Sequence, residues 1–363
     1  MQVRRTAESF FMTDYIEIVS RPEPTAIQRL ARDAKKLKLS PKAVYSNGNG
    51  LPDCETVGDV REWLCRGYDK LHQKVVTGSQ QFRLSEETQN KSLALLLNPS
   101  ATKIFTLNDR DLMLQAFDIM LPQFISFVQA DPDNEVVLVN FICGSGGSSL
   151  DRPDIPLAAS QAQARKILTQ MGRHWFALTE CAFFNSKRHV TGGRHLQQHT
   201  HSLLWGPEAH AKTDKVARRC ESTLAPNVTE ADRIRVVKAW DNTDANLARL
   251  LAYLIKAPSV AKNWVPGREG KPGFMNHSEK GDRLINYYRL AMLQSMLTFK
   301  DASFASNEGF QMRMSASKAT DTIAKTIGGQ LPLFHQDEIP AFWSDVLREG
   351  RWEKARLPVI RRS

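Results

Sequence analysis

The chain has 363 residues, more than a single compact core usually holds (roughly 250–300), so two or three domains are expected. Hydrophobic residues make up 42% of it and charged residues 24%, a composition that excludes a disordered chain. The net charge of +10 favours an anionic partner, with nucleic acid first, and a mildly basic enzyme with scattered surface charges is the alternative.

The cysteine content and the N-terminus bear on the compartment. The five cysteines are odd in number and form no CxxC pair, which is typical of a reduced intracellular protein. The N-terminal "MQVRRTAESFFMTDY" carries two arginines, but its apolar "FFM" is too short for a signal peptide. No run approaches the roughly 18 apolar residues of a spanning helix. We expect a cytoplasmic protein without a membrane partner.

Residues 1–130 are predicted to form a helical, basic N-terminal region. The stretch "AIQRLARDAKKLKLSPK" carries six basic residues between Arg29 and Lys42. Helices are expected over 56–76 and 108–129, and Pro122 is expected to kink the second. The turn residues of 130–135 separate this region from the next.

From residue 131 the pattern changes to alternating strands and helices. Strands are expected at 135–143, 174–184 and 195–206. Helices are expected at 157–172, 206–223, 230–240 and 243–258. The Gly-rich stretch 185–193 is typical of a connection between paired strands. This order predicts an α+β domain over 131–260 with a central antiparallel sheet and flanking helices, followed by a helical C-terminal region over 261–363.

The strand "HLQQHTHSLLWG" places two histidines on one face. Side chains alternate along a strand, so His199 and His201 project together and can chelate one cation. Glu180 in the preceding strand can add a carboxylate, which suits Mn²⁺ or Mg²⁺, and His195 or Gln197 could replace it because they share the parity of the pair.

Two other interpretations of these histidines remain open. Both can be strand residues hydrogen-bonded within the domain. Alternatively, Cys181, His195, His199 and Cys220 can form a zinc site, although their spacing matches none of the usual ligand patterns.

A tyrosine follows the histidines on a predicted helix. In "LARLLAYLIKAP", Tyr253 and Lys256 are three residues apart and therefore neighbours on a helix. The leucines at 247, 250, 251 and 254 form the buried stripe, and Lys256 and Arg249 lie nearly opposite it. Tyr253 therefore flanks a basic face, where a phenol can meet a phosphate, and the alternative is a boundary tyrosine beside a solvated lysine.

These residues together resemble the HUH endonuclease superfamily, which includes rolling-circle replication initiators, relaxases and single-strand transposases. The resemblance covers about a third of the chain, roughly 135–258. The order of "HTHSLLW" and, 52 residues after His201, "YLIK" resembles the replication initiators. Relaxases often carry the tyrosine near the N-terminus, where Tyr15 is the candidate. The residue between the histidines is Thr200, where the superfamily usually has a bulky apolar residue.

The resemblance implies a ferredoxin- or RRM-like topology and a nicking-joining reaction. His199, His201 and Glu180 would hold Mn²⁺ or Mg²⁺, Tyr253 would attack the scissile phosphate to form a 5′-phosphotyrosine, and Lys256 would stabilise the charge. The expected partner is single-stranded or hairpin DNA at the replication origin of a plasmid or phage. No GxxxxGK[ST] motif occurs, so no attached helicase domain is expected. A host helicase is a candidate further partner. The alternatives are a mobilisation relaxase or transposase, a non-catalytic DNA-binding protein, and a structural metal-binding protein.

Overall fold

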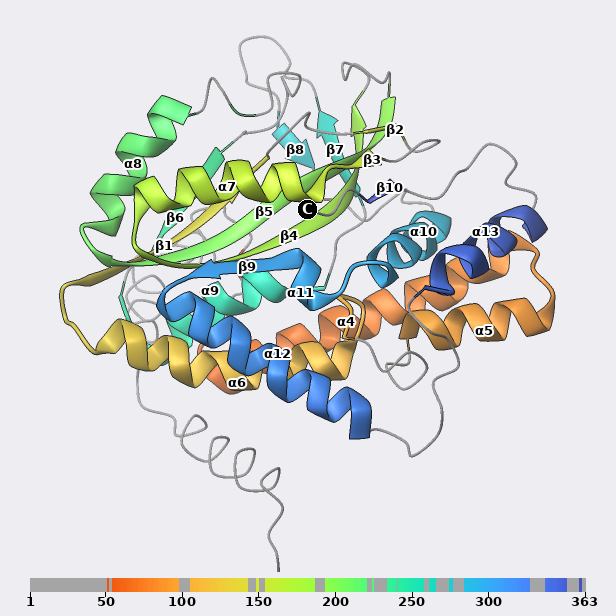
Figure 1. Ribbon diagram of the computed structural model, residues 1–363, viewed down its shortest axis with the longest axis horizontal. Coiled ribbons are helices and arrows are strands. Elements are labelled where there is room, and N and C mark those ends of the chain that lie inside the picture. The colour runs from red at the N-terminus through yellow and green to blue at the C-terminus, as the bar shows by residue number, and fades with distance from the viewer. Residues whose placement is uncertain are drawn as a thin grey trace, which may run out of the picture.

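The computed structural model describes the chain from Leu51 onward, with gaps (Figure 1). The described residues are 51, 54–97, 105–142, 148–149, 154–186, 193–220, 224, 234–239, 241–257, 261–265, 274–276, 284–326, 337–350 and 359–360. The basic stretch at 29–42 and Tyr15 lie outside them.

One mixed sheet forms the centre of the molecule. Its main path has the order β6 (Ile234–Lys238), β1 (Asn134–Phe141), β5 (Gly193–Pro207), β4 (His174–Ser186), β7 (Ala261–Val265) and β8 (Phe274–Asn276). Two further strands join it, β2 (Ser148–Ser149) on β5 and β9 (Ser303–Ser306) on β4. Five strands pair antiparallel in the order β6, β1, β5, β4 and β9, whereas β7 pairs parallel with β4. A separate short pair joins β3 (Asp154–Ile155) to β10 (Val359–Ile360).

The middle of the chain follows a β-α-β-β-α-β order. Strand β1 leads through α7 (Leu157–Met171) to the β4–β5 hairpin, and α8 (Ala209–Cys220) leads to β6. The first and fourth of these strands are neighbours, and the third separates the first from the second. This is the split βαβ arrangement, in which both helices return over one face of an antiparallel sheet. The expected α+β architecture with a central antiparallel sheet and flanking helices is therefore confirmed.

The helices cover the two faces of the sheet unequally (Figure 1). Helices α7 and α8 cover one face, where Val137, Val139 and Leu204 are buried with residues of both helices. The other face packs on a larger helical layer. We call the remaining described helices together the helical layer. They are α4 (Val57–Ser79), η1 (Gln80–Phe82), α5 (Glu86–Leu97), α6 (Arg110–Gln129), α9 (Asp244–Ile255), α10 (Leu284–Ser295), α11 (Phe299–Ala302), α12 (Glu308–Thr326) and α13 (Ile339–Glu349).

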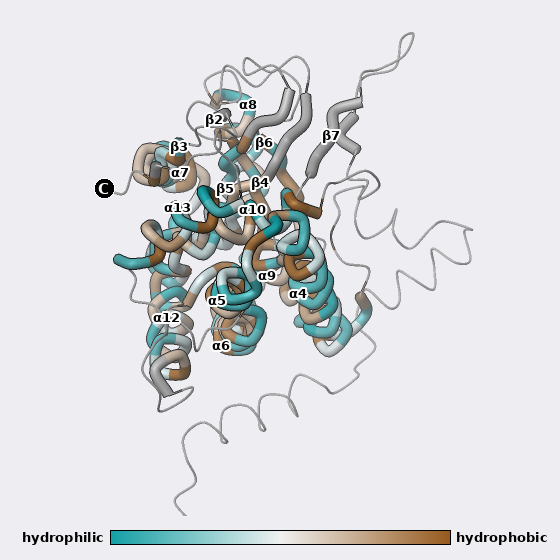
Figure 2. Tube along the Cα trace, turned by 90° about the vertical axis from the view of Figure 1, so that its right-hand side faces the viewer, coloured by the Kyte–Doolittle hydropathy of each residue, from teal (hydrophilic) through white to brown (hydrophobic). Residues whose placement is uncertain are grey.

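The helical layer forms because its helices are amphipathic, and Figure 2 shows hydrophobic and hydrophilic segments alternating along them. Helix α4 starts with a capping box in which Thr56 and Asp59 bond each other's backbone. Helix α6 continues through Pro122 to Gln129. Among the described helices, only α6 is long and apolar enough to cross a membrane, and residues such as Phe117, Leu121 and Phe124 are instead fully buried in the core. The expected cytoplasmic location stays a prediction.

Most of the expected elements are present with small shifts in their bounds. The predicted helix at 157–172 ends as expected, because Gly172 caps α7 through its N–H to the carbonyl of Leu168. The helix predicted at 230–240 is wrong, because residues 234–238 form β6. Strand β6 contains Ile234, Val236 and Val237, and it pairs with the free edge of β1. Pairing with a distant strand outweighs the local pattern there.

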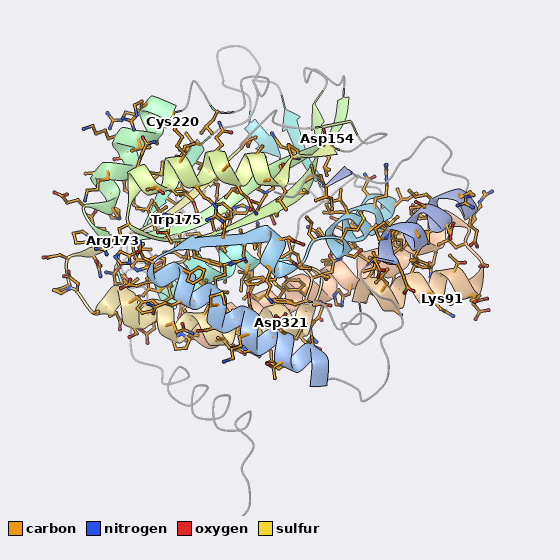
Figure 3. The ribbon with its side chains drawn as sticks, in the orientation of Figure 1. Lys91, Asp154, Arg173, Trp175, Cys220 and Asp321 are labelled. Atoms are coloured by element: carbon orange, nitrogen blue, oxygen red, sulfur yellow. The ribbon has the colours of Figure 1, made fainter. Side chains whose placement is uncertain are left out.

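The three predicted segments share one hydrophobic core. Buried residues from 1–130, 131–260 and 261–363, such as Leu64, Leu251 and Trp343, belong to the same cluster. The C-terminal segment, which we expected to be helical, also contributes β7, β8 and β9 to the sheet. On the opposite face, Trp175 (labelled in Figure 3) packs edge-on against Phe304 of β9, with ring centroids 5.7 Å apart. The division into three domains stays a prediction.

Candidate metal centre

Glu180, His199 and His201 meet on the face of the sheet that packs on the helical layer. Glu180 of β4 lies directly opposite His199 of β5 in the antiparallel register. The Nε2 atoms of His199 and His201 lie 2.6 and 2.7 Å from the same oxygen, Oε1 of Glu180. The three candidate ligand atoms all lie within 4.8 Å of one another. Among the described residues this is the only such group of His, Cys, Asp or Glu side chains. We call these three residues the cluster.

The cluster is almost closed to solvent, with 3% of the Glu180 side chain, 6% of His199 and 2% of His201 exposed. Burial alone would raise the pKa of Glu180, but the Lys256 ammonium and the two imidazoles hold it well below its usual range. Burial, aided by the charge of Lys256, lowers the pKa of His201 to about 3. His201 is therefore neutral near pH 7, the state in which an imidazole binds a metal.

Asn140 fixes which nitrogen of His201 carries the proton. Its Oδ1 lies 2.5 Å from Nδ1 of His201, so Nδ1–H donates to it. In a neutral ring the lone pair is then on Nε2, which faces the negative oxygen of Glu180 at 2.7 Å. The two acceptors repel each other, and the Lys256 ammonium, 3.2 Å from the same oxygen, offsets part of this repulsion. Two imidazoles and one carboxylate within 4.8 Å of one another are a donor set that fits a divalent transition metal or Mn²⁺.

Tyr253 lies against the cluster, as the sequence suggested. Its ring centroid is 5.4 Å from that of His201, and the two rings are nearly perpendicular. Ten of the twelve residues of α9 are buried, and Tyr253 is one of the two that are not. The expected leucine stripe is confirmed, because Leu247, Leu250, Leu251 and Leu254 are each at most 1% exposed. The phenol therefore lies between the buried cluster and the more open surroundings.

Lys256 lies beside both Glu180 and Tyr253. Helix α9 ends at Ile255, and Lys256 is its C-cap with an extended ψ of 156°. Its Nζ lies 3.2 Å from Oε1 of Glu180 and 4.7 Å from the centroid of the Tyr253 ring. Burial opposes the charge of Lys256, but Glu180 keeps its pKa above the ordinary value. The lysine is therefore charged and is directed at the cluster.

The basic face predicted for α9 is wrong. Arg249 is 1% exposed and lies within the protein, and only 17% of the Lys256 side chain is exposed. Helix α9 packs on α4 and α6 as well as on β4 and β5. Contacts with two layers bury it on nearly all sides, which a single amphipathic stripe does not reveal.

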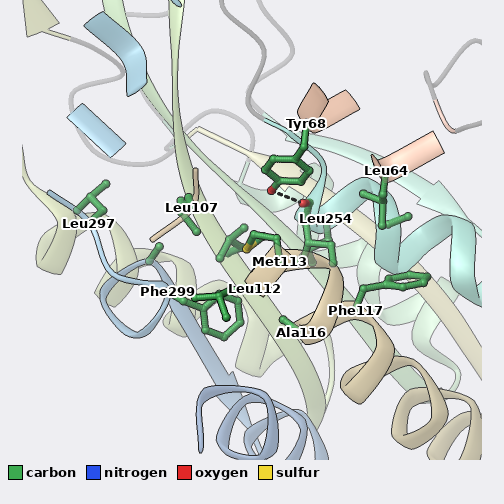
Figure 4. Close-up of a cluster of buried hydrophobic side chains, with 14 of the residues drawn as sticks. Leu64, Tyr68, Leu107, Leu112, Met113, Ala116, Phe117, Leu254, Leu297 and Phe299 are labelled. Atoms are coloured by element: carbon green, nitrogen blue, oxygen red, sulfur yellow. Dashed lines mark hydrogen bonds between the residues drawn. The ribbon is translucent and has the colours of Figure 1, made fainter. Parts of the chain in front are cut away.

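Tyr68 of α4 supports the end of α9. It is 1% exposed, and its hydroxyl donates to the carbonyl oxygen of Ile255 at 3.0 Å (Figure 4). That carbonyl belongs to the last turn of α9, where helix carbonyls lack intrahelical partners. The bond therefore fixes the backbone next to Lys256 from an element about 190 residues earlier in the chain.

The other candidate tyrosines have different surroundings. Tyr287 is 5% exposed, and its hydroxyl accepts a hydrogen bond from Lys74 at 3.0 Å. Tyr288 is fully buried and packs against Phe82 and Trp343. Tyr253, in contrast, has a ring contact with a residue of the cluster.

The alternative ligands do not join the cluster. Gln197 shares its face and is fully buried, and both polar atoms of its amide lack a hydrogen-bond partner among the described residues. The His195 side chain lies outside the described residues. Cys181 follows Glu180 in β4, so its side chain projects from the opposite face of the sheet, away from the cluster. Burial raises the pKa of its thiol to about 12. The proposed zinc site of cysteines and histidines is not assembled among the described residues.

Thr200 has a partner that explains a polar residue between the histidines. Its Oγ1 lies 3.1 Å from Oγ1 of Thr179, directly across the β4–β5 ladder and on the face covered by α7. Both side chains are 1% exposed. The pair satisfies both hydroxyls in the buried layer, so no bulky apolar residue is required there.

Sequence reasoning missed Asn140 and Tyr68. Asn140 gave a signal, because it is the polar residue inside the apolar run "VVLVNF". Tyr68 gave none, since a tyrosine on an amphipathic helix is ordinary. The chain matches no protein-family model, no curated protein and no solved structure.

Proposed function

We propose that this protein is a metal-dependent single-strand DNA endonuclease of the HUH type, which nicks DNA through Tyr253 and initiates rolling-circle replication. The observation that carries the proposal is the convergence of five residues from three elements. Glu180, His199 and His201 form a metal-ligand set, Tyr253 packs on His201, and Lys256 is bound to Glu180. The split βαβ order and the basic composition agree with this proposal.

A divalent ion bound at Glu180, His199 and His201 would supply Lewis-acid charge to a non-bridging oxygen of the scissile phosphate. The phenolic oxygen of Tyr253 forms a bond to phosphorus while the bond from phosphorus to the 3′ oxygen breaks. The phenolic proton leaves to solvent and the 3′ oxygen takes up a proton, giving a 5′-phosphotyrosine and a free 3′-hydroxyl.

Lys256 acts in this scheme through its charge and not as a base. Because Glu180 raises its pKa, the amine keeps its proton at neutral pH. An ammonium 4.7 Å from the Tyr253 ring stabilises the phenolate and then the phosphotyrosine. Asn140 and Tyr68 are positioning residues, because each acts through a neighbour.

A non-catalytic DNA-binding protein with a structural metal is the second candidate. The near-complete burial of the cluster favours it, since structural metal sites are closed whereas catalytic ones keep an open position. The partly exposed Tyr253 favours the enzyme, because a buried cluster alone has no use for a phenol beside it.

The test is incubation with a library of single-stranded and hairpin oligonucleotides and Mn²⁺, followed by denaturing electrophoresis. We expect a covalent protein–DNA adduct with the wild type and none with His199→Ala, His201→Ala or Tyr253→Phe. Tyr287→Phe is the matched control and should keep the adduct. DNA binding without any adduct would refute the endonuclease and support the second candidate. An adduct on a different tyrosine would refute the role of Tyr253.

A further inference from the structure

Positive charge is concentrated on two of the described helices. Helices α7 and α8 together carry six basic side chains and one acidic one. Helices α4, α5 and α6 in the other layer carry six basic and seven acidic side chains. The excess charge of the described helices therefore lies on the face of the sheet opposite the cluster. We call the exposed surface of α7 and α8 the basic face.

The basic side chains of this face are accessible to solvent, although the Arg165 guanidinium lies over the Phe304 ring, 5.0 Å from its centroid. All six are exposed. They are Arg165, Lys166, Lys212, Lys215, Arg218 and Arg219. Lys166, Lys215 and Arg218 have no ion-pair partner among the described residues, and the single acid, Asp214, is bound by Lys238 of β6 at 2.6 Å. The charge of the basic face is therefore hardly neutralised from within the protein.

The two helices present these charges as one rigid surface. They pack against each other over the same hydrophobic cluster, and Arg219 donates a hydrogen bond to the Gln170 side chain. On α8, Lys215, Arg218 and Arg219 have the i, i+3, i+4 spacing of neighbours on one helix face.

The composition of the basic face indicates what it contacts. Surfaces for single strands combine basic residues with aromatic side chains on which bases stack. Neither α7 nor α8 contains Phe, Trp or Tyr. A rigid cationic surface without stacking groups suits the phosphates of a duplex, which are regularly spaced and read without regard to sequence.

We propose that the basic face of α7 and α8 is a docking surface for the backbone of double-stranded DNA, separate from the nicking site on the other side of the sheet. The choice of DNA rests on the proposed function, in which duplex flanks the nicked strand. Docking needs neither the cluster nor Tyr253, so duplex binding and cleavage can fail independently. The basic residues in the last turn of α8 also complement the helix dipole, which would affect stability but not DNA affinity.

The test compares two triple variants with the same change in net charge. Lys166→Gln, Lys215→Gln and Arg218→Gln neutralise the basic face. Arg66→Gln, Lys70→Gln and Lys91→Gln neutralise exposed lysines and arginine on α4 and α5 as the control. Binding to a 20-base-pair duplex and to one of its strands is measured by fluorescence anisotropy in EDTA, between 50 and 200 mM salt.

For the basic-face variant, we expect the slope of log K against log salt to fall by about 2.7 with the duplex, because each lost phosphate contact removes about 0.9. Between 50 and 200 mM salt, the variant's affinity for the duplex should therefore fall by a factor about 40 times smaller than the factor for the wild type. The control variant should change the slope by less than about 1. If Arg218→Gln unfolds α8, the double variant Lys166→Gln with Lys215→Gln should still lower the slope by about 1.8.

Equal effects of the two triple variants would overturn the proposal, because net charge and not location would then matter. An unchanged duplex slope would also overturn it, as would a loss of binding confined to the single strand. If the wild type binds the duplex through these residues but forms no adduct with any oligonucleotide in Mn²⁺, the proposed endonuclease is refuted and the basic face remains a duplex-binding surface.

Discussion

Substitution of Asn140 by alanine tests whether the cluster is built for a metal. In the wild type, Oδ1 of Asn140 accepts Nδ1–H of His201 at 2.5 Å and leaves the lone pair on Nε2. Without this acceptor, the proton of the neutral ring moves to Nε2, where Oε1 of Glu180 accepts it at 2.7 Å. A metal must then displace that proton before it can bind His201.

The magnitude follows from the bond that forms in the variant. A hydrogen bond to a charged acceptor is worth about 1.5–3 kcal/mol, and loss of a residue that orients a metal ligand lowers metal affinity about 10–100-fold. We therefore expect Asn140→Ala to weaken Mn²⁺ binding by about 10–100-fold. Asn140→Asp is the matched control, because a carboxylate oxygen at the same place still accepts from Nδ1 and should keep the affinity at least at the wild-type value.

The assay is isothermal titration of EDTA-treated protein with MnCl₂ at pH 7.5, with thermal unfolding as the check on folding. Imidazole ¹⁵N shifts of His201 report the position of the proton directly. An Mn²⁺ affinity of Asn140→Ala within about 2-fold of the wild type would refute the tautomer reasoning. So would an Asn140→Asp variant as weak as the alanine variant.

Three further predictions concern stability and the nucleophile. Tyr253→Phe should abolish the DNA adduct yet change the free energy of unfolding by no more than about 0.5 kcal/mol, and a larger loss in urea titration would indicate a structural role. Tyr68→Phe should cost about 1–3 kcal/mol, because the Ile255 carbonyl loses its buried donor, and an unchanged urea midpoint would contradict this. Burial raises the pKa of Asp109 to about 7, so the folded state binds more protons than the unfolded state between about pH 4 and 7. Stability should therefore decline as pH rises through this window, by up to about 4 kcal/mol, and urea titrations of Asp109→Asn should show a flatter pH profile if the carboxyl is responsible.

The cluster could be predicted because its geometry follows from a period of two. His199 and His201 share a face in any strand, and a short Gly-rich connection makes the preceding strand its antiparallel neighbour. The pairing of Glu180 with His199 then depends only on the register of one hairpin. Local rules of this kind are readable without knowing the rest of the fold.

The features that the sequence did not reveal depend on distant packing. Arg249 is buried because α9 contacts two layers, and β6 is a strand because β1 offers it an edge. Tyr68 reaches Ile255 across nearly 190 residues of chain. None of these contacts leaves a periodic pattern in its own segment, so composition and spacing cannot identify them.

The alternation of β5 also explains how one sheet can serve two surfaces. Its odd-numbered residues, which include His199 and His201 of the cluster, face the helical layer. Its even-numbered residues face α7, where Gln198 accepts a hydrogen bond from Ser160 and Thr200 pairs with Thr179. These contacts form only in one register, because a shift by one residue would place the histidines under α7 and their polar neighbours against the helical layer. The polar pairs on the α7 side therefore hold the histidines in place, and the Ser160–Gln198 bond also joins α7 to the strand that carries the cluster.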